Sequence, residues 1–169
     1  MAEFSLVTVW EIAAPLQHVW DAIYRADDWP KWWPCVEHVA LLKAGDDAGV
    51  GAVRRLTWHT RLPYRITFAT RATVVEPPFA LDAEAFGDLE GCGRWRLSRQ
   101  GSKTIVRYVW DVRLVKQWMA RIAPIARPAF EWNHRGVMRA GGEGLARYLA
   151  SPGAERCAAE GESPYSRLA

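Results

Sequence analysis

One titratable side chain stands out by its surroundings in the sequence: His134, near the C-terminus. It lies among apolar residues spaced three or four apart, the spacing of one face of an α-helix. An imidazole there could hydrogen-bond a ligand oxygen or, with Tyr108, transfer protons near neutral pH. It could instead be a core histidine satisfied by a Thr or Tyr hydroxyl across the gap. The sequence leaves these roles open.

The segment that must position His134 is predicted to be a long helix. Its pattern indicates a short helical lead-in over Trp118–Ala126 and one amphipathic helix over Pro128–Ala150, roughly 34 Å long at 1.5 Å per residue. Glu and Arg side chains set mostly four residues apart occupy the opposite, exposed face, and Ser-Pro-Gly follows at 151–153. The apolar stripe consists of Phe130, His134, Val137, Met138, Gly141, Leu145 and Tyr148.

This helix carries four glycines, at Gly136, Gly141, Gly142 and Gly144. Each costs about 1 kcal/mol relative to alanine in a helix interior. Close approach of the helix to a sheet could offset that cost, and so could room left for a ligand. Both interpretations stay open.

The chain holds 10 tryptophans in 169 residues, which is an unusually high content. Trp58, Trp95 and Trp110 fall on the inward faces of three predicted strands, where indoles can stack on ring systems or isoprenoid chains. The Trp29–Trp33 segment lies in a rigid, proline-containing hinge and suits a plug or gate. Filling of the core is the alternative for all of them.

Strand-like alternation occupies most of the chain before the long helix. Two helices are predicted after the first strand. One begins at Pro15 and has an apolar face up to Ile23, and the other is a very short helix at Trp29–Trp33 capped by Asp27-Asp28. Because the later strands are joined by short turns, the order predicts an antiparallel meander and an α+β fold class. We expect a curved antiparallel sheet of about seven strands wrapped around the C-terminal helix, with two short helices after the first strand. The predicted strands are Phe4–Ile12, Val36–Lys43, Val50–Thr60, Tyr64–Val75, Phe79–Phe86, Gly93–Ser98 and Thr104–Leu114.

The inward strand faces and the apolar helix stripe together predict a pocket between sheet and helix. Small residues (Ala83, Ala85, Gly93 and Gly141) would leave volume unfilled there, and hydroxyls of Tyr64, Thr70 and Tyr108 could contact a ligand or satisfy one another. The predicted ligand-binding residues are Leu56, Trp58, Tyr64, Phe68, Thr70, Ala83, Trp95, Tyr108, Trp110, Phe130, His134, Val137 and Met138.

Arg54 shares its strand face with two of these residues, Leu56 and Trp58. If it pointed inward it would need an anionic partner, such as a ligand carboxylate, because an unpaired buried charge is very costly. A position at the rim of the pocket is the favoured interpretation.

Charge and motif content exclude several other classes of function. The net charge is only +3 and no basic run occurs, so nucleic-acid binding is not expected. Three scattered cysteines (35, 92 and 157) and four dispersed histidines predict neither a disulfide framework nor a metal site, and no cofactor motif is present. We predict a cytoplasmic protein without signal peptide or transmembrane segment.

The entry of the chain resembles a known superfamily. The matching segments are Ile12-Ala13-Ala14-Pro15 leading into Val19-Trp20, and then Trp29-Pro30 with Trp32-Trp33. They resemble the corresponding part of proteins in the START-like, SRPBCC or polyketide cyclase/dehydrase superfamily, which includes the birch-pollen allergen. The resemblance covers roughly residues 4–150 and implies the helix-grip fold with a hydrophobic cavity. The Cys and His pairs of a Rieske cluster are missing, so an oxygenase subunit is not implied.

These observations lead to three functional hypotheses. The first is binding of a lipid, isoprenoid or polyketide-like compound in one domain at 1–150, followed by a flexible tail at 151–169. The second is a polyketide aromatase/cyclase or dehydratase that uses His134 as acid and base, with Tyr108. The third is a protein-interaction module.

Overall fold

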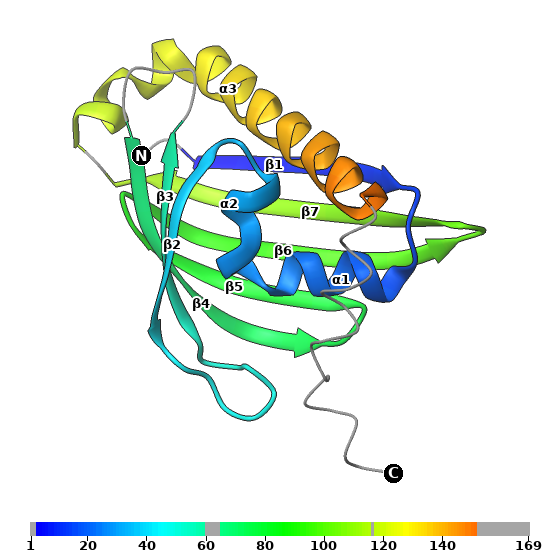
Figure 1. Ribbon diagram of the computed structural model, residues 1–169. Helices are drawn as coiled ribbons and strands as arrows, with labels where there is room; N and C mark the ends of the chain where they lie inside the picture. Colours follow the sequence, from blue (N-terminus) through cyan, green and yellow to red (C-terminus); the bar gives the residue numbers. More distant parts are fainter. Residues whose placement is uncertain (1–2, 60–64, 116, 152–169) are drawn as a thin grey trace.

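The computed structural model describes residues 3–59, 65–115 and 117–151, with the side chains of 117–126 outside this description. The chain forms one antiparallel sheet of seven strands in the order β1-β7-β6-β5-β4-β3-β2. The long helix α3 (Gln117–Ala150) runs across the concave face of the curved sheet, and two short helices lie beside it (Figure 1). The predicted α+β helix-grip fold class is confirmed.

The strands follow the alternation of the sequence. In β7, for example, Val106, Trp110, Val112 and Leu114 are buried, while Arg107 and Arg113 between them are exposed. Residues two apart share one face of a strand, so this pattern turns the apolar side chains toward α3. The strands are β1 (Glu3–Ile12), β2 (Val36–Lys43), β3 (Val53–His59), β4 (Arg65–Glu76), β5 (Ala80–Gly87), β6 (Leu89–Gln100) and β7 (Lys103–Leu114).

The helices between β1 and β2 contribute buried apolar residues to the core. They are α1 (Leu16–Tyr24), a 3₁₀ turn η1 (Ala26–Asp28) and α2 (Trp29–Trp32). The first begins one residue after Pro15, so the start predicted at Pro15 is wrong by one residue. The side chain of Asp28 makes no capping hydrogen bond, so the predicted side-chain cap of the second helix is also wrong.

Three further boundaries differ from prediction. The C-terminal helix does not restart at Pro128 but is continuous from Gln117, and its first turns bend away from the axis of the rest (Figure 1). Proline inside a helix can be accommodated by a bend of this kind. Strand β3 starts at Val53 instead of Val50, and β6 starts at Leu89, inside a segment predicted as a turn. Only Asp88 separates β5 from β6, and Gly87 at the end of β5 takes the positive φ of 126° that this tight connection uses.

A β-bulge changes one inward face. The pairing of β4 with β5 shifts between Ala72 and Val74, so Val75 packs against the core where the sequence pattern placed Val74. A bulge adds one residue to a strand, so every side chain after it points to the opposite face of the sheet from the one that simple alternation predicts.

On the outer face of the sheet, arginines pair with carboxylates of neighbouring strands. Arg96 bonds Asp82, Arg94 bonds Asp111, and Arg113 bonds Glu90. These arginines therefore occupy a solvated, charge-balanced surface. None of the described helices is both long and apolar enough to cross a bilayer.

Candidate ligand-binding site

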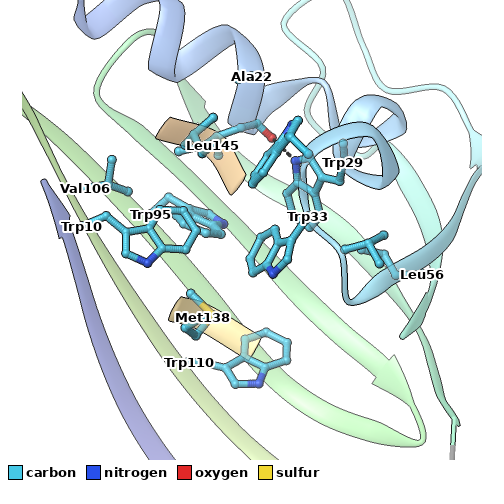
Figure 2. Close-up of a cluster of buried hydrophobic side chains, with 14 of the residues drawn as sticks. Trp10, Ala22, Trp29, Trp33, Leu56, Trp95, Val106, Trp110, Met138 and Leu145 are labelled. Atoms are coloured by element: carbon cyan, nitrogen blue, oxygen red, sulfur yellow. Dashed lines mark hydrogen bonds between the residues drawn. The ribbon is translucent and has the colours of Figure 1, made fainter. Parts of the chain in front are cut away.

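Tryptophans of α2 and its flank fill the middle of the space between α3 and the sheet. Trp33 is 1% exposed, and its ring centroid lies 5.5 Å from that of Trp10, 5.3 Å from Trp29 and 5.1 Å from Trp58. Its indole N–H donates to the carbonyl of Val137 in α3 at 2.9 Å. Figure 2 shows the rings of Trp10, Trp29 and Trp33, which come from different parts of the chain. The tryptophans of the Trp29–Trp33 segment are therefore buried in the core, and a role for the segment as a plug or gate stays a prediction.

The helix glycines make room for these rings. A Cβ at Gly141 would lie 2.4 Å from Cε2 of Trp33, and a Cβ at Gly142 would lie 2.9 Å from the indole of Trp10. A Cβ at Gly144 would meet the Trp32 carbonyl oxygen. The predicted close approach to the sheet is therefore found at Gly142, which packs on Trp10 of β1, whereas Gly141 and Gly144 approach Trp33 and Trp32 of the α2 segment instead.

A cavity of about 130 Å³ remains beside the tryptophans, at the end of the sheet where β1 and β4 begin and β7 ends. None of its described lining residues is Asp, Glu, Lys or Arg. Its polar groups come from Asn133, His134, Tyr108 and the indoles. The lining consists of Phe4, Leu6, Trp29, Trp33, Trp58, Ile66, Phe68, Leu89, Trp95, Tyr108, Trp110, Val112, Leu114, Phe130, Asn133, His134, Val137 and Met138.

Most of the residues that the sequence singled out line this cavity. Leu56, Thr70 and Ala83 do not: Leu56 is buried and the other two are half-buried. Leu56 pairs with the lining residue Phe68, and Ala83 pairs with Gly93, which pairs with the lining residue Trp110, so these two lie level with the cavity without lining it. Tyr64 is outside the described residues. The predicted residues found in the lining are Trp58, Phe68, Trp95, Tyr108, Trp110, Phe130, His134, Val137 and Met138; their contact with a ligand stays a prediction.

Asn133 is the polar lining residue that sequence reasoning missed. It is buried, and it comes three residues after Phe130 and four before Val137. That spacing places it on the same helix face, so helical periodicity alone could have identified it. Arg54, in contrast, does not line the cavity, and its Nε is 3.4 Å from Oδ2 of Asp27. Its partner is thus a carboxylate of the chain itself.

His134 is half-buried and lines the cavity. Burial lowers its pKa from 6.5 to about 4, because desolvation disfavours the charged form. No hydrogen bond joins it to a Thr or Tyr within the described part of the chain. It is therefore neutral near pH 7, with a ring nitrogen able to accept and another able to donate.

Tyr108 is held by its neighbours. Its ring stacks on Trp95 with centroids 3.9 Å apart and lies 5.8 Å from Trp110, while Gly93 leaves room for its hydroxyl. Desolvation, with a smaller contribution from Cys92, raises the pKa of Tyr108 well above 10. The phenol stays protonated and can act as a hydrogen-bond donor. The described residues contain no group of His, Cys, Asp and Glu side chains that could hold a metal ion.

This geometry can be compared with known proteins. Residues 3–150 match the model of the family described as polyketide cyclase / dehydrase and lipid transport. The chain belongs to this family. The resemblance seen in the Ala-Pro and Trp-Pro entry motifs is thereby confirmed. A comparison with curated proteins found no match.

Solved structures similar to this family member share its fold at low identity. The Zhui aromatase/cyclase from Streptomyces sp. R1128 has a TM-score of 0.69 at 17% identity, over 93% of this chain and 96% of that one. A START superfamily protein from Mycobacterium smegmatis has a TM-score of 0.71 at 13% identity, over 86% and 96%. The di-domain ARO/CYC BexL has a TM-score of 0.70 at 19% identity, over 88% of this chain, which spans only 50% of BexL.

Proposed function

We propose that this protein binds a small, uncharged, apolar molecule in the cavity between α3 and the sheet. The observation that carries the proposal is the lining, which is almost wholly apolar and aromatic and contains no formal charge near pH 7. Removing apolar surface from water would drive binding. A cavity near 150 Å³ lined by apolar side chains can hold benzene. The present cavity, at about 130 Å³, therefore has room for about one aromatic ring, which could be the whole ligand or a part of a larger one.

A second candidate is catalysis by His134 in an aromatase/cyclase or dehydratase reaction. The position of the imidazole in the cavity, with Tyr108 lining the same space, favours it. A pKa of about 4 makes His134 a weak base near pH 7, however, where a general base works best with a pKa close to the working pH. Binding without chemistry needs no such group, and we therefore rank it first. No comparable observation among the described residues favours a protein-interaction module.

Filling the cavity tests the binding proposal. Val112 lines the cavity, whereas Val7 on β1 is 55% exposed, so Val112→Phe and Val7→Phe make the same change inside and outside the site. Toluene binding is measured by titration calorimetry or ligand-observed NMR. We expect Val112→Phe to weaken binding at least tenfold and Val7→Phe to leave it unchanged. Wild-type protein that binds neither toluene nor any co-purified apolar compound, checked by native mass spectrometry after solvent extraction, would overturn the proposal.

The enzymatic alternative has its own test. A stabilised poly-β-keto thioester is offered to wild type, His134→Ala and His38→Ala, where His38 is an exposed histidine on the edge strand β2. Cyclised product from wild type and the His38 variant but not from the His134 variant would support catalysis by His134. Product from all three would contradict that role.

A further inference from the structure

A second hollow lies along the side of α3, between the helix and Cys35 just before β2. It is a groove of about 390 Å³. Asn133 and Val137 line both this groove and the cavity, so the two hollows are neighbours. The described lining of the groove consists of Cys35, Trp132, Asn133, Arg135, Gly136, Val137, Arg139, Ala140 and Glu143.

Gly136 is the helix glycine that packing does not explain. The glycines at 141, 142 and 144 make room for tryptophan residues, whereas a Cβ at position 136 would meet nothing within 4 Å. Glycine in a helix interior nevertheless costs about 1 kcal/mol relative to alanine. Gly136 and Ala140, one turn later, both line the groove, so small residues keep this side of the helix open. A ligand lying across them would explain the glycine.

Asn133 brings a buried amide to the same place. The residue is 9% exposed, yet its carboxamide forms no hydrogen bond within the described part of the chain. It is not among the fully occluded side-chain groups without a partner, which in the described core are three indole nitrogens. The carboxamide therefore keeps some accessible surface, and the hollows that Asn133 borders are the groove and the cavity. Since buried amides are normally hydrogen-bonded, a ligand in the groove could supply the missing partner.

Two arginines of the groove carry charges that the described residues do not pair. Arg135 and Arg139 are exposed, and neither forms an ion pair there. Glu131, four residues before Arg135, is bonded instead to Arg127. Positions four apart are neighbours on a helix surface, where like charges repel. Glu143 is the carboxylate of the described lining, so two cations stand against one anion, and the groove favours an anionic ligand.

We propose that this groove is a second binding site, and that it takes a flat aromatic molecule bearing a carboxylate. The ring lies over Gly136 and Ala140 beside the indole of Trp132, which is 50% exposed. The carboxylate accepts hydrogen bonds from the guanidinium groups of Arg135 and Arg139, whose planar fork suits it. The described lining of the cavity carries no charged side chain, so the two sites select different ligands. The groove does not depend on the function proposed for the cavity.

Two probes of the same shape test the preference for an anion. Naphthalene-2-carboxylate is charged near pH 7 and naphthalene-2-carboxamide is not, and ligand-observed NMR gives a Kd for each. The readout is the ratio of the two Kd values in each protein. We expect Arg135→Gln/Arg139→Gln to shift the ratio against the carboxylate about fivefold, as the loss of two exposed ion pairs would. Arg55→Gln/Arg107→Gln removes the same charge from exposed positions outside the groove and should leave the ratio unchanged.

Filling the groove tests where the probe binds. Gly136→Leu places a side chain in the groove, and Ala146→Leu places one on an exposed part of α3 outside it. We expect Gly136→Leu to weaken binding of the carboxylate by about tenfold or more, and Ala146→Leu to leave it unchanged. If Gly136→Leu does not fold, Ala140→Leu fills the same groove.

Three results would overturn the inference: no binding of the carboxylate to wild type, displacement of the carboxylate by toluene, or a Kd ratio unchanged in Arg135→Gln/Arg139→Gln. Undiminished binding in the variant that fills the groove would do the same. Toluene binding is measured on its own, so failure of the groove site leaves the cavity proposal standing, and failure of the cavity proposal leaves the groove site standing.

Discussion

Gly141 of α3 lies directly against the indole of Trp33, so closely that a Cβ at position 141 would be 2.4 Å from Cε2 of the ring. Trp33 belongs to the segment between α2 and β2, and its N–H also bonds the Val137 carbonyl one helical turn earlier. The two contacts dock the helix on the tryptophan cluster. They also close the middle of the space between helix and sheet, which confines the cavity to one end.

Gly141→Ala should therefore destabilise the protein, although alanine is the better helix former. We expect a loss on the order of 1–3 kcal/mol from overpacking. Gly136→Ala is the matched control, because nothing lies within 4 Å of a Cβ at that position. It should be neutral or stabilise by up to about 1 kcal/mol. Urea unfolding measures both, and equal effects would contradict the close packing of Trp33 on Gly141.

The depressed pKa of His134 predicts a loss of stability in acid. Its pKa is about 4 in the folded protein against 6.5 unperturbed, so between these pH values the unfolded chain binds a proton that the folded chain refuses. The free energy of unfolding should fall as pH drops through this window, by up to about 3 kcal/mol from this residue.

His134→Gln should remove that part of the pH dependence, whereas His38→Gln, at an exposed position, should retain it. Urea unfolding of all three proteins between pH 7 and pH 4 provides the measurement. If wild type and His134→Gln lost the same free energy of unfolding between pH 7 and pH 4, the prediction that burial lowers the pKa of His134 would be wrong.

Reducing the plug should enlarge the cavity. Trp33→Phe removes one ring from the cavity wall, and we expect it to bind naphthalene at least tenfold more tightly than wild type while losing on the order of 1–3 kcal/mol of stability. Trp32→Phe is the control, because Trp32 is buried and stacked on Trp33 but does not line the cavity. It should lose stability without gaining affinity. Calorimetric titration distinguishes the two variants, and equal naphthalene affinities would argue against a plug at Trp33.

Thr104 should contribute to stability through one buried hydrogen bond. Its side chain is fully buried, and its hydroxyl donates to the Ala14 carbonyl at 2.8 Å, which ties the start of β7 to the turn before α1. Thr104→Val keeps the shape but leaves that carbonyl without its donor, at a cost of about 1–2 kcal/mol. Thr57→Val, whose hydroxyl lies 3.4 Å from that of Thr67, should cost less than about 0.5 kcal/mol. Thermal unfolding of the two variants checks the difference.

The sequence by itself determined the element order, the antiparallel meander and the inward face of α3. Alternation along β7 and the three-to-four spacing from Phe130 to Tyr148 are local patterns, and the buried residues follow them. The same local information located His134 on the inward stripe. Local periodicity determines which face of an element is buried, because each face repeats within a few residues.

Only the tertiary structure decided how the buried space is divided. Trp33 and Val137 are 104 residues apart in sequence, and no local pattern shows that one bonds the other or that Gly141 makes room for the indole. The same holds for the burial that lowers the pKa of His134. Packing density and desolvation arise from elements that meet only after the chain has folded. Periodicity therefore predicted the walls of a pocket, while contacts between distant residues set its position and size.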